Sequence, residues 1–338
     1  MVHAQRDRGG GSLRLPTGRA WRAGAGVLLA LAWCVTWALG IARYGGPDEP
    51  AHVLRAYAVA HGEWVGEQPD GTELAPGYRI VTAPASLASG DPACFRHDST
   101  VTPDCAVPSA STETIRVATS AGINPPLYYA VVGGLARLFG TAAAQPGTYR
   151  IVAACLNALV LALAAWRLRP AGFIALAAFS PAAWFLLGVV NPNGFELVLA
   201  SLAWVGVLRW TQGHRTPSAA LWVSVPMAVA VAARPIALVE TMAMVAVAAV
   251  LGGRTRQASQ HPWRLRLAWA LPLVAAISSV VVWQAVLGAA YVHDPRTAQQ
   301  GSFLTAVRRS FARVPLNARE LVGSLGWREY WAPPVAQV

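Results

Sequence analysis

Three side chains that can accept or donate a proton follow the first hydrophobic segment: Asp48, Glu49 and His52. A carboxylate or an imidazole held beside a substrate hydroxyl can take its proton. His52 lies four residues after Asp48 and three after Glu49, so a helix starting here would carry them on one face. The carboxylates could equally just cap that helix, and His52 could be only a local hydrogen-bond partner. We treat the three as candidate catalytic residues.

The composition indicates a membrane protein. Of 338 residues, 55% are hydrophobic and 13% are charged, and the mean hydropathy is +0.41. A soluble chain could not bury that much apolar surface. The net charge is +11, but the arginines are scattered between apolar runs without a basic helix or finger pattern. The lipid bilayer is therefore the expected partner, and nucleic acid is not.

The chain opens with a basic segment followed by an apolar run. Residues 1–22 carry five arginines against one acid, and residues 23–42 are apolar. This order predicts a cytoplasmic N-terminus and a first transmembrane helix at 23–42 that runs outward. A cleaved signal peptide is the alternative, but the apolar run is long for a signal and further spans follow.

Residues 43–149 are expected to form a large extracytoplasmic loop with juxtamembrane helices. Residues 49–61 carry apolar side chains at helical spacing and precede Gly62, which predicts a short helix at the membrane surface. The rest of this polar stretch is rich in proline, and few strands are expected. Cys94 and Cys105 lie in it, and an oxidising compartment would favour a disulfide between them.

The other cysteines, Cys34 and Cys155, lie in apolar segments and are expected to be inert small side chains. No spacing resembles a Cys/His metal-binding set. No cofactor and no metal ligands are indicated, and a divalent cation is left open as an alternative that no residue pattern supports.

A second short helix is expected after Asn124-Pro125-Pro126-Leu127-Tyr128-Tyr129 and ends near Gly140. It either crosses the membrane or lies on its outer surface. If it crossed, Arg167 and Arg169 at the end of the next helix would lie outside the cell. The surface position keeps them in the cytoplasm, so we favour a juxtamembrane helix.

Residues 150–290 are expected to form a transmembrane bundle, with helices at 150–168, 172–190, 195–210, 219–251 and 267–290. The run at 219–251 would be about 50 Å long as one helix, against a hydrocarbon core of about 30 Å. Arg234-Pro235 divides it into two, which gives about seven spans in all and an all-α polytopic fold. The break at Arg234 and the turn at Asn191-Pro192-Asn193-Gly194 both face outward.

Two acids lie close to the expected hydrocarbon region. Glu240 follows Arg234 by six residues and could pair with it, whereas Glu196, just after the outer turn, could be only interfacial.

Residues 291–338 are expected to be an extracytoplasmic amphipathic tail. Arg308, Arg309 and Arg313 lie in or beside a predicted basic helix at 302–312. Adhesion to lipid headgroups would explain this helix, and phosphate binding by the arginine side chains is the sharper alternative. No closing span follows, so we expect the C-terminal spans of a longer architecture to be missing.

Three motifs carry a resemblance: Pro47-Asp48-Glu49 before a surface helix, the Pro-Pro-Leu-Tyr-Tyr helix, and Gly323-Ser324-Leu325-Gly326-Trp327. Together they resemble the bacterial multi-pass membrane family catalogued as domain of unknown function 2142. The first two are also remotely similar to the lipid-linked-sugar glycosyltransferases of the type C fold, which include protein mannosyltransferases and the aminoarabinose transferases of lipid A.

The type C resemblance implies inverting transfer of a sugar from a polyprenyl-phosphate donor to a cell-envelope acceptor on the outer face. The first-loop acidic residue of that family falls on Asp48, with Glu49 beside it, as the proton acceptor. Positive charge would help the phosphate to leave. The expected substrate-binding residues are Asn124, Tyr128, Tyr129, Asn191, Asn193, Arg234, Arg308, Arg309 and Arg313.

The chain departs from the type C pattern because further spans and a C-terminal outer domain are missing. The competing hypothesis is a non-catalytic transporter or assembly partner for envelope polysaccharide. A transporter would be expected to show internal repeats, and the sequence contains no convincing repeat.

Overall fold

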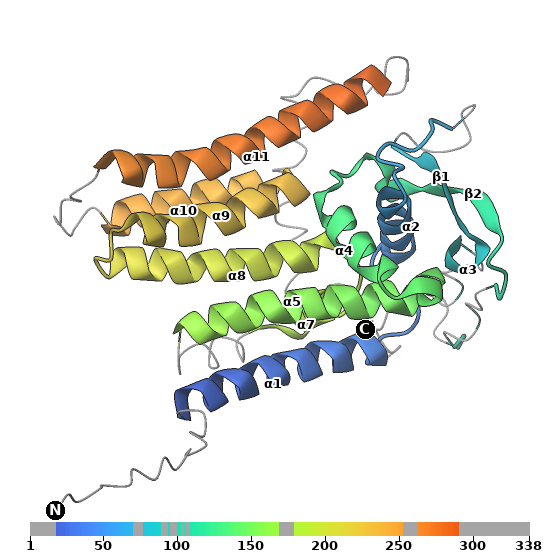
Figure 1. Ribbon diagram of the computed structural model, residues 1–338, viewed down its shortest axis with the longest axis horizontal. Helices are drawn as coiled ribbons and strands as arrows, with labels where there is room; N and C mark the ends of the chain where they lie inside the picture. The colour runs from blue at the N-terminus through green and yellow to red at the C-terminus, as the bar shows by residue number, and fades with distance from the viewer. Residues whose placement is uncertain are drawn as a thin grey trace, which may run out of the picture.

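The chain folds into a bundle of long helices with a smaller polar region, which we call the cap, packed against one end (Figure 1). This computed structural model describes residues 18–69, 77–88, 94, 100–102, 105, 109–168, 179–252 and 262–290. The cap lies between α1 and α5 in the sequence and contains α2, α4 and a β-hairpin. The predicted tail at 291–338 lies outside the described residues.

The bundle contains α1 (Gly18–Gly40), α5 (Pro146–Leu168), the short α7 (Pro181–Leu187), α8 (Pro192–Thr211), α9 (Pro217–Ala233), α10 (Ala237–Gly252) and α11 (Pro262–Ala290). Helix α1 packs on α5, α5 on α8, α8 on both α9 and α10, and α9 on α11. The long helices run back and forth (Figure 1). The cap therefore meets the C-terminal ends of α1, α9 and α11 and the N-terminal ends of α5, α8 and α10.

Within the described residues, three helices are long and apolar enough to cross a membrane: Pro146–Arg167, Pro192–Thr211 and Trp263–Leu287. Three apolar helices are shorter, at Gly24–Gly40, Pro217–Ala233 and Ala237–Leu251. Residues 172–178 of the predicted span at 172–190 fall outside the described residues, and the described remainder contains only the short helix α7. The number of about seven spans stays a prediction.

The three helices of membrane-spanning length differ in burial, with α5 and α8 at the centre of the bundle and α11 at its periphery. In the α5 and α8 spans 61% of the residues are buried, but in the α11 span only 17% are buried. Helix α11 exposes a row of large apolar side chains, including Leu271, Val274, Val281 and Val282. A helix with that much exposed apolar surface needs an apolar solvent, as the bilayer provides.

Three helices of the bundle begin with a capping side chain followed by proline. The side chains of Ser180, Asn191 and Thr216 each accept a backbone N–H from the first turn, and Pro181, Pro192 and Pro217 follow them. Proline fits the first helical position because its missing N–H has no helical partner there. The predicted turn at Asn191-Pro192-Asn193-Gly194 is therefore the start of α8, and the predicted start at residue 195 is three residues late.

The predicted break at Arg234 is confirmed. Helix α9 ends at Ala233, Arg234 has an extended backbone, and α10 begins at Ala237. Proline at 235 disfavours helical geometry at the preceding residue, which explains why the apolar run divides there.

The cap corrects the all-α expectation, because it contains a two-stranded antiparallel sheet. Strands β1 (Arg79–Pro84) and β2 (Thr114–Thr119) pair from Arg79 opposite Thr119 to Pro84 opposite Thr114. Both strands are rich in the β-branched residues isoleucine, valine and threonine, which favour strands. The prolines between the strands suggested an irregular region, but they lie in the connection and leave the pairing intact.

The helices of the cap are α2 (Glu49–Ala60), α3 (Ala85–Ala88), α4 (Leu127–Arg137) and the 3₁₀ turns η2 (Ser120–Ile123) and η3 (Gly140–Ala144). Helix α4 has 11 residues and is therefore about 16 Å long, against a hydrocarbon core of about 30 Å. It packs on α2, where a Cβ at Gly133 would lie 2.0 Å from the carbonyl oxygen of Ala56. Glycine thus permits the close crossing of these two helices.

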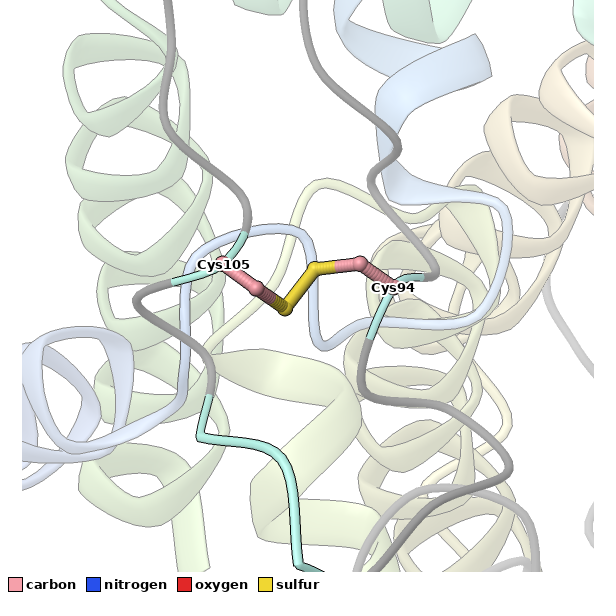
Figure 2. The surroundings of a disulfide bond; sticks show 2 residues. All are labelled: Cys94 and Cys105. Carbon is pink, nitrogen blue, oxygen red and sulfur yellow. A yellow bond between two sulfur atoms is a disulfide. The ribbon is translucent and has the colours of Figure 1, made fainter.

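Figure 2 shows the disulfide between Cys94 and Cys105, which the sequence predicted. The two Cα atoms are 6.2 Å apart. Cys34 in α1 is buried and Cys155 in α5 is partly buried, and both are free thiols.

Candidate functional site

The chain around the acidic pair is held by a buried ion pair between Glu49 and Arg150. Arg150 Nε donates to Glu49 Oε1 at 2.8 Å, and Arg150 Nη2 donates to Oε2. The backbone N–H groups of Gly46 and Val190 also donate to this carboxylate. Glu49 is 2% exposed. With four donors on its two oxygens, it serves the fold and leaves no exposed oxygen for a substrate.

Arg150 also closes the end of α1. Its Nη1 donates to the carbonyls of Ala38 and Ile41, and its Nη2 donates to that of Ala42. The last carbonyls of a helix lack helical partners, and a cation there complements the helix dipole. One side chain thus joins α1, α2 and α5 directly beneath the loop that carries Asp48.

Asp48 differs from Glu49 in its exposure, its hydrogen bonds and its backbone conformation. Its side chain is exposed and makes no capping hydrogen bond to α2. Its backbone has φ 54° and ψ 15°, in the left-handed region that most residues avoid. The alternative of a side-chain cap does not hold for this carboxylate, which stays exposed where the cap meets the bundle.

Asn191 holds Pro47, the residue before Asp48, in place. Its Nδ2 donates to the carbonyl of Pro47 at 2.9 Å, and its Oδ1 accepts the backbone N–H of Asn193 at 2.9 Å. Asn191 is buried, whereas Asn193 is partly exposed. Asn191 is thus a positioning residue that ties the acidic loop to the start of α8.

A chain of three polar side chains lies beneath this loop. Asn124 Nδ2 donates to the Tyr129 hydroxyl at 2.8 Å, and that hydroxyl lies 2.8 Å from His52 Nδ1. Because the hydroxyl accepts from Asn124, its single proton is free to be donated to His52. This direction places the imidazole proton on Nε2.

Burial keeps this chain neutral. Burial lowers the pKa of His52 to about 3, with a smaller contribution from the positive charge of Arg234. Burial also raises the pKa of the Tyr129 hydroxyl above its usual value, against the hydrogen bond from Asn124. His52 is therefore an uncharged acceptor at neutral pH, and the predicted proton-transfer role has no support in its surroundings.

Tyr128 lies deeper in the molecule than Tyr129. Its ring packs edge-on against Tyr129, with centroids 5.3 Å apart, and 5.7 Å from the ring of Phe195. The hydroxyl faces the backbone of Asn191 outside hydrogen-bond geometry. Tyr128 is fully buried, so it fills the joint between α4 and α8 and does not reach the surface.

Arg234 follows α9 at the end of the bundle that meets the cap, and its positive charge contributes to lowering the pKa of His52. It forms an ion pair with Glu196 of α8. The predicted pairing with Glu240 is wrong, because Glu240 is exposed on the first turn of α10 and Glu196 is buried beside the break. The Arg234 side chain is 33% exposed, so part of the guanidinium faces outward.

A family model described as "Predicted membrane protein (DUF2142)" matches residues 31–338. The chain belongs to this family. A search of curated proteins and a search of solved structures each returned no match. The family resemblance drawn from the three motifs is thereby confirmed, and the match includes the cap, the bundle and the tail of this DUF2142 protein.

Three of the residues predicted to bind substrate in this family member cannot be placed relative to the site. Arg308, Arg309 and Arg313 fall outside the described residues. In the part of the chain that is described, no group of three His, Cys, Asp or Glu side chains is placed to hold a metal ion.

Arg150 is the residue of the candidate site that sequence reasoning missed in this DUF2142 chain. An isolated arginine near the start of a long apolar helix was the available signal, because a charge there needs a partner. Its partner lies 101 residues earlier in the sequence, so the pattern alone could not name it.

Proposed function

We propose that this DUF2142 protein crosses the cell membrane about seven times, with its N-terminus in the cytoplasm and its cap outside. Support comes from the bundle end opposite the cap, which carries Arg167, Arg209, Arg215, Arg264 and Arg266. Arginines concentrate on the cytoplasmic side of membrane proteins. The disulfide in the cap fits an oxidising compartment on the other side.

At this outer surface, we propose that the protein transfers a sugar from a polyprenyl-phosphate donor to a cell-envelope acceptor. The observation that supports this best is the contrast between two adjacent carboxylates. Glu49 is buried and fully hydrogen-bonded, whereas the side chain of Asp48 is exposed and makes no hydrogen bond within the described residues, and its backbone is held in a left-handed conformation. A non-glycine residue that surrounding contacts hold in this sparsely populated conformation is typical of functional sites.

The proposed chemistry uses Asp48 as the general base. The acceptor oxygen attacks the anomeric carbon of the donor sugar, and its proton passes to the Asp48 carboxylate. The bond between that carbon and the phosphate oxygen breaks with inversion, and the phosphate keeps the electron pair. Arg234 supplies positive charge for the leaving phosphate, since its partly exposed guanidinium has donors beyond the one that binds Glu196.

Five neighbouring residues act as positioning groups in this proposal. Glu49 and Arg150 hold the two ends of the acidic loop, and Asn191 holds its middle. His52 and Tyr129 form a neutral hydrogen-bonded support beneath it. The base therefore stands on fixed elements, which is what a transfer reaction requires of a catalytic group.

Deletion of the gene in its natural host tests this function. Lipid-linked sugars and envelope glycans would be extracted from the deletion strain and from a strain carrying the restored gene, then analysed by mass spectrometry. We expect one lipid-linked sugar to accumulate and one sugar to be lost from an envelope glycan, both reversed by the restored gene. Unchanged pools of both would contradict the proposal and favour a non-catalytic role.

A further inference from the structure

Arg55 in the middle of α2 is a fully buried cation, at 0% exposure. Its Nη2 donates to two backbone carbonyls, those of Trp64 at 2.7 Å and Asn124 at 3.2 Å. Its Nε and Nη1 are buried and have no hydrogen-bond partner among the residues that the structure describes. Among the ion pairs of the described residues, none includes Arg55.

A second buried arginine lies between the same two chain segments. Arg79 of β1 is 2% exposed. A Cβ built on Gly66 would lie 2.9 Å from Arg79 Cβ, and one on Gly122 would lie 2.4 Å from it. Arg55 bonds to residues 64 and 124, two positions away in each segment. The two guanidinium groups therefore share one small region of the cap.

Two aromatic rings lie close to the guanidinium of Arg55. Its Cζ lies 5.9 Å from the centroid of the Tyr129 ring and 5.6 Å from that of Trp283. Trp283 is fixed by a 2.9 Å hydrogen bond from its Nε1 to the carbonyl of Ile123. Ring faces attract a cation, but they accept no N–H from its edges, so three N–H bonds of Arg55 remain unmatched.

The charge on Arg55 persists despite its burial. Burial lowers the pKa of Arg55 to about 10, and the charge of Arg79 acts in the same direction. The group is therefore protonated at neutral pH. A buried charge with unmatched donors is strongly unfavourable unless an opposite charge offsets it.

We propose that Arg55, with Arg79 beside it, binds a phosphate-type oxyanion inside the cap. Two neighbouring guanidinium groups favour phosphate, which carries more charge and more acceptor oxygens than a single carboxylate. The phosphate belongs either to an anionic lipid headgroup or to a soluble phosphate compound. This site does not include Asp48 or Arg234. Phosphate binding to it is measured without sugar transfer, so the result tests this proposal independently of the transferase proposal.

Thermal unfolding of the purified full chain tests the site. Arg55→Met removes the charge at similar side-chain length, and Arg116→Met removes an exposed arginine of the cap as a control. One arm compares inorganic phosphate with chloride at equal ionic strength, in phosphatidylcholine nanodiscs. The other arm compares phosphatidylglycerol with phosphatidylcholine nanodiscs at constant salt.

We expect a saturable rise in the unfolding temperature of at least about 3 °C for the wild type and for Arg116→Met, and no rise for Arg55→Met. A response to inorganic phosphate assigns the site to a soluble phosphate, and a response to phosphatidylglycerol alone assigns it to a lipid headgroup. If Arg55→Met does not fold, Arg55→Lys replaces it, with an expected loss of phosphate affinity of about tenfold. No response of the wild type in either arm, or an equal response of the Arg55 variant, would overturn the proposal.

Discussion

Arg150 of α5 and Glu49 of α2 form a buried, two-point ion pair that also closes the end of α1. The two side chains are 10% and 2% exposed. Because both charges are removed from water, each depends on the other far more than the partners of a surface pair do. The pair is therefore the structural foundation of the loop that presents Asp48.

Glu49→Gln should destabilise the protein by about 3–5 kcal/mol, since it leaves Arg150 buried without a counter-charge. The double variant Glu49→Gln with Arg150→Met should be less destabilised than the sum of the single variants. Unfolding by urea in detergent gives all three free energies. Arg116 and Glu67 form an exposed pair, and breaking it as a control should cost about 1 kcal/mol or less. Additive effects of the two buried substitutions would show that they are not coupled.

Two adjacent glycines of α4 should respond oppositely to alanine. At Gly133 an added Cβ would meet the carbonyl of Ala56 at 2.0 Å, so Gly133→Ala should separate α4 from α2 and destabilise the fold by about 1–3 kcal/mol. At Gly134 a Cβ would meet no atom of the described residues within 4 Å, so Gly134→Ala should stabilise the helix by up to about 1 kcal/mol. The same unfolding measurement distinguishes them, and similar effects at both positions would refute the close crossing.

The buried imidazole of His52 should make stability depend on pH. Its pKa in the folded state is about 3, below the usual 6.5. The unfolded chain therefore binds a proton on this side chain as the pH falls below about 6.5, and the folded chain does not. Stability should be unaffected by His52 above that pH and should decline from pH 6.5 towards 3. His52→Gln should decline less steeply over this range, and equal slopes would show that His52 is protonated in the folded protein.

Much of the bundle could be predicted from apolar runs and their interruptions. The sequence predicted the break at Arg234, the short helix after Asn124 and the disulfide, because each depends on local sequence. The hairpin was missed because its strands are short and lie 29 residues apart, between Pro84 and Thr114 at their nearest ends. Their pairing is a tertiary contact that proline-rich flanks obscure.

The candidate site was only half predictable for a similar reason. Spacing identified Asp48 and Glu49 as a chemical pair, but only the fold assigns one to the surface and the other to Arg150. Likewise, Arg234 was recognised as a charge needing a partner, yet proximity in sequence favoured Glu240 over the true partner Glu196 on another helix. Partners distant in sequence require the packing of helices to be known.

The position of the cap relative to the membrane can be tested with its own cysteines. Cys105→Ser breaks the disulfide and frees Cys94, whereas Cys34 and Cys155 stay within the bundle. A membrane-impermeant maleimide should label this variant in intact cells and should not label the wild type. Labelling that appears only after the membrane is permeabilised would place the cap in the cytoplasm.

The central claim is that Asp48 is the general base, and transfer by the Asp48→Asn variant tests it most directly. Asparagine tolerates the left-handed backbone as aspartate does and is uncharged, so folding should be preserved while the base is lost. The variant would be expressed in the deletion strain at wild-type abundance, and the envelope glycan and its lipid-linked donor would be quantified. We predict that transfer falls at least about 100-fold and that the donor accumulates. Wild-type glycan and donor pools with Asp48→Asn would contradict the account.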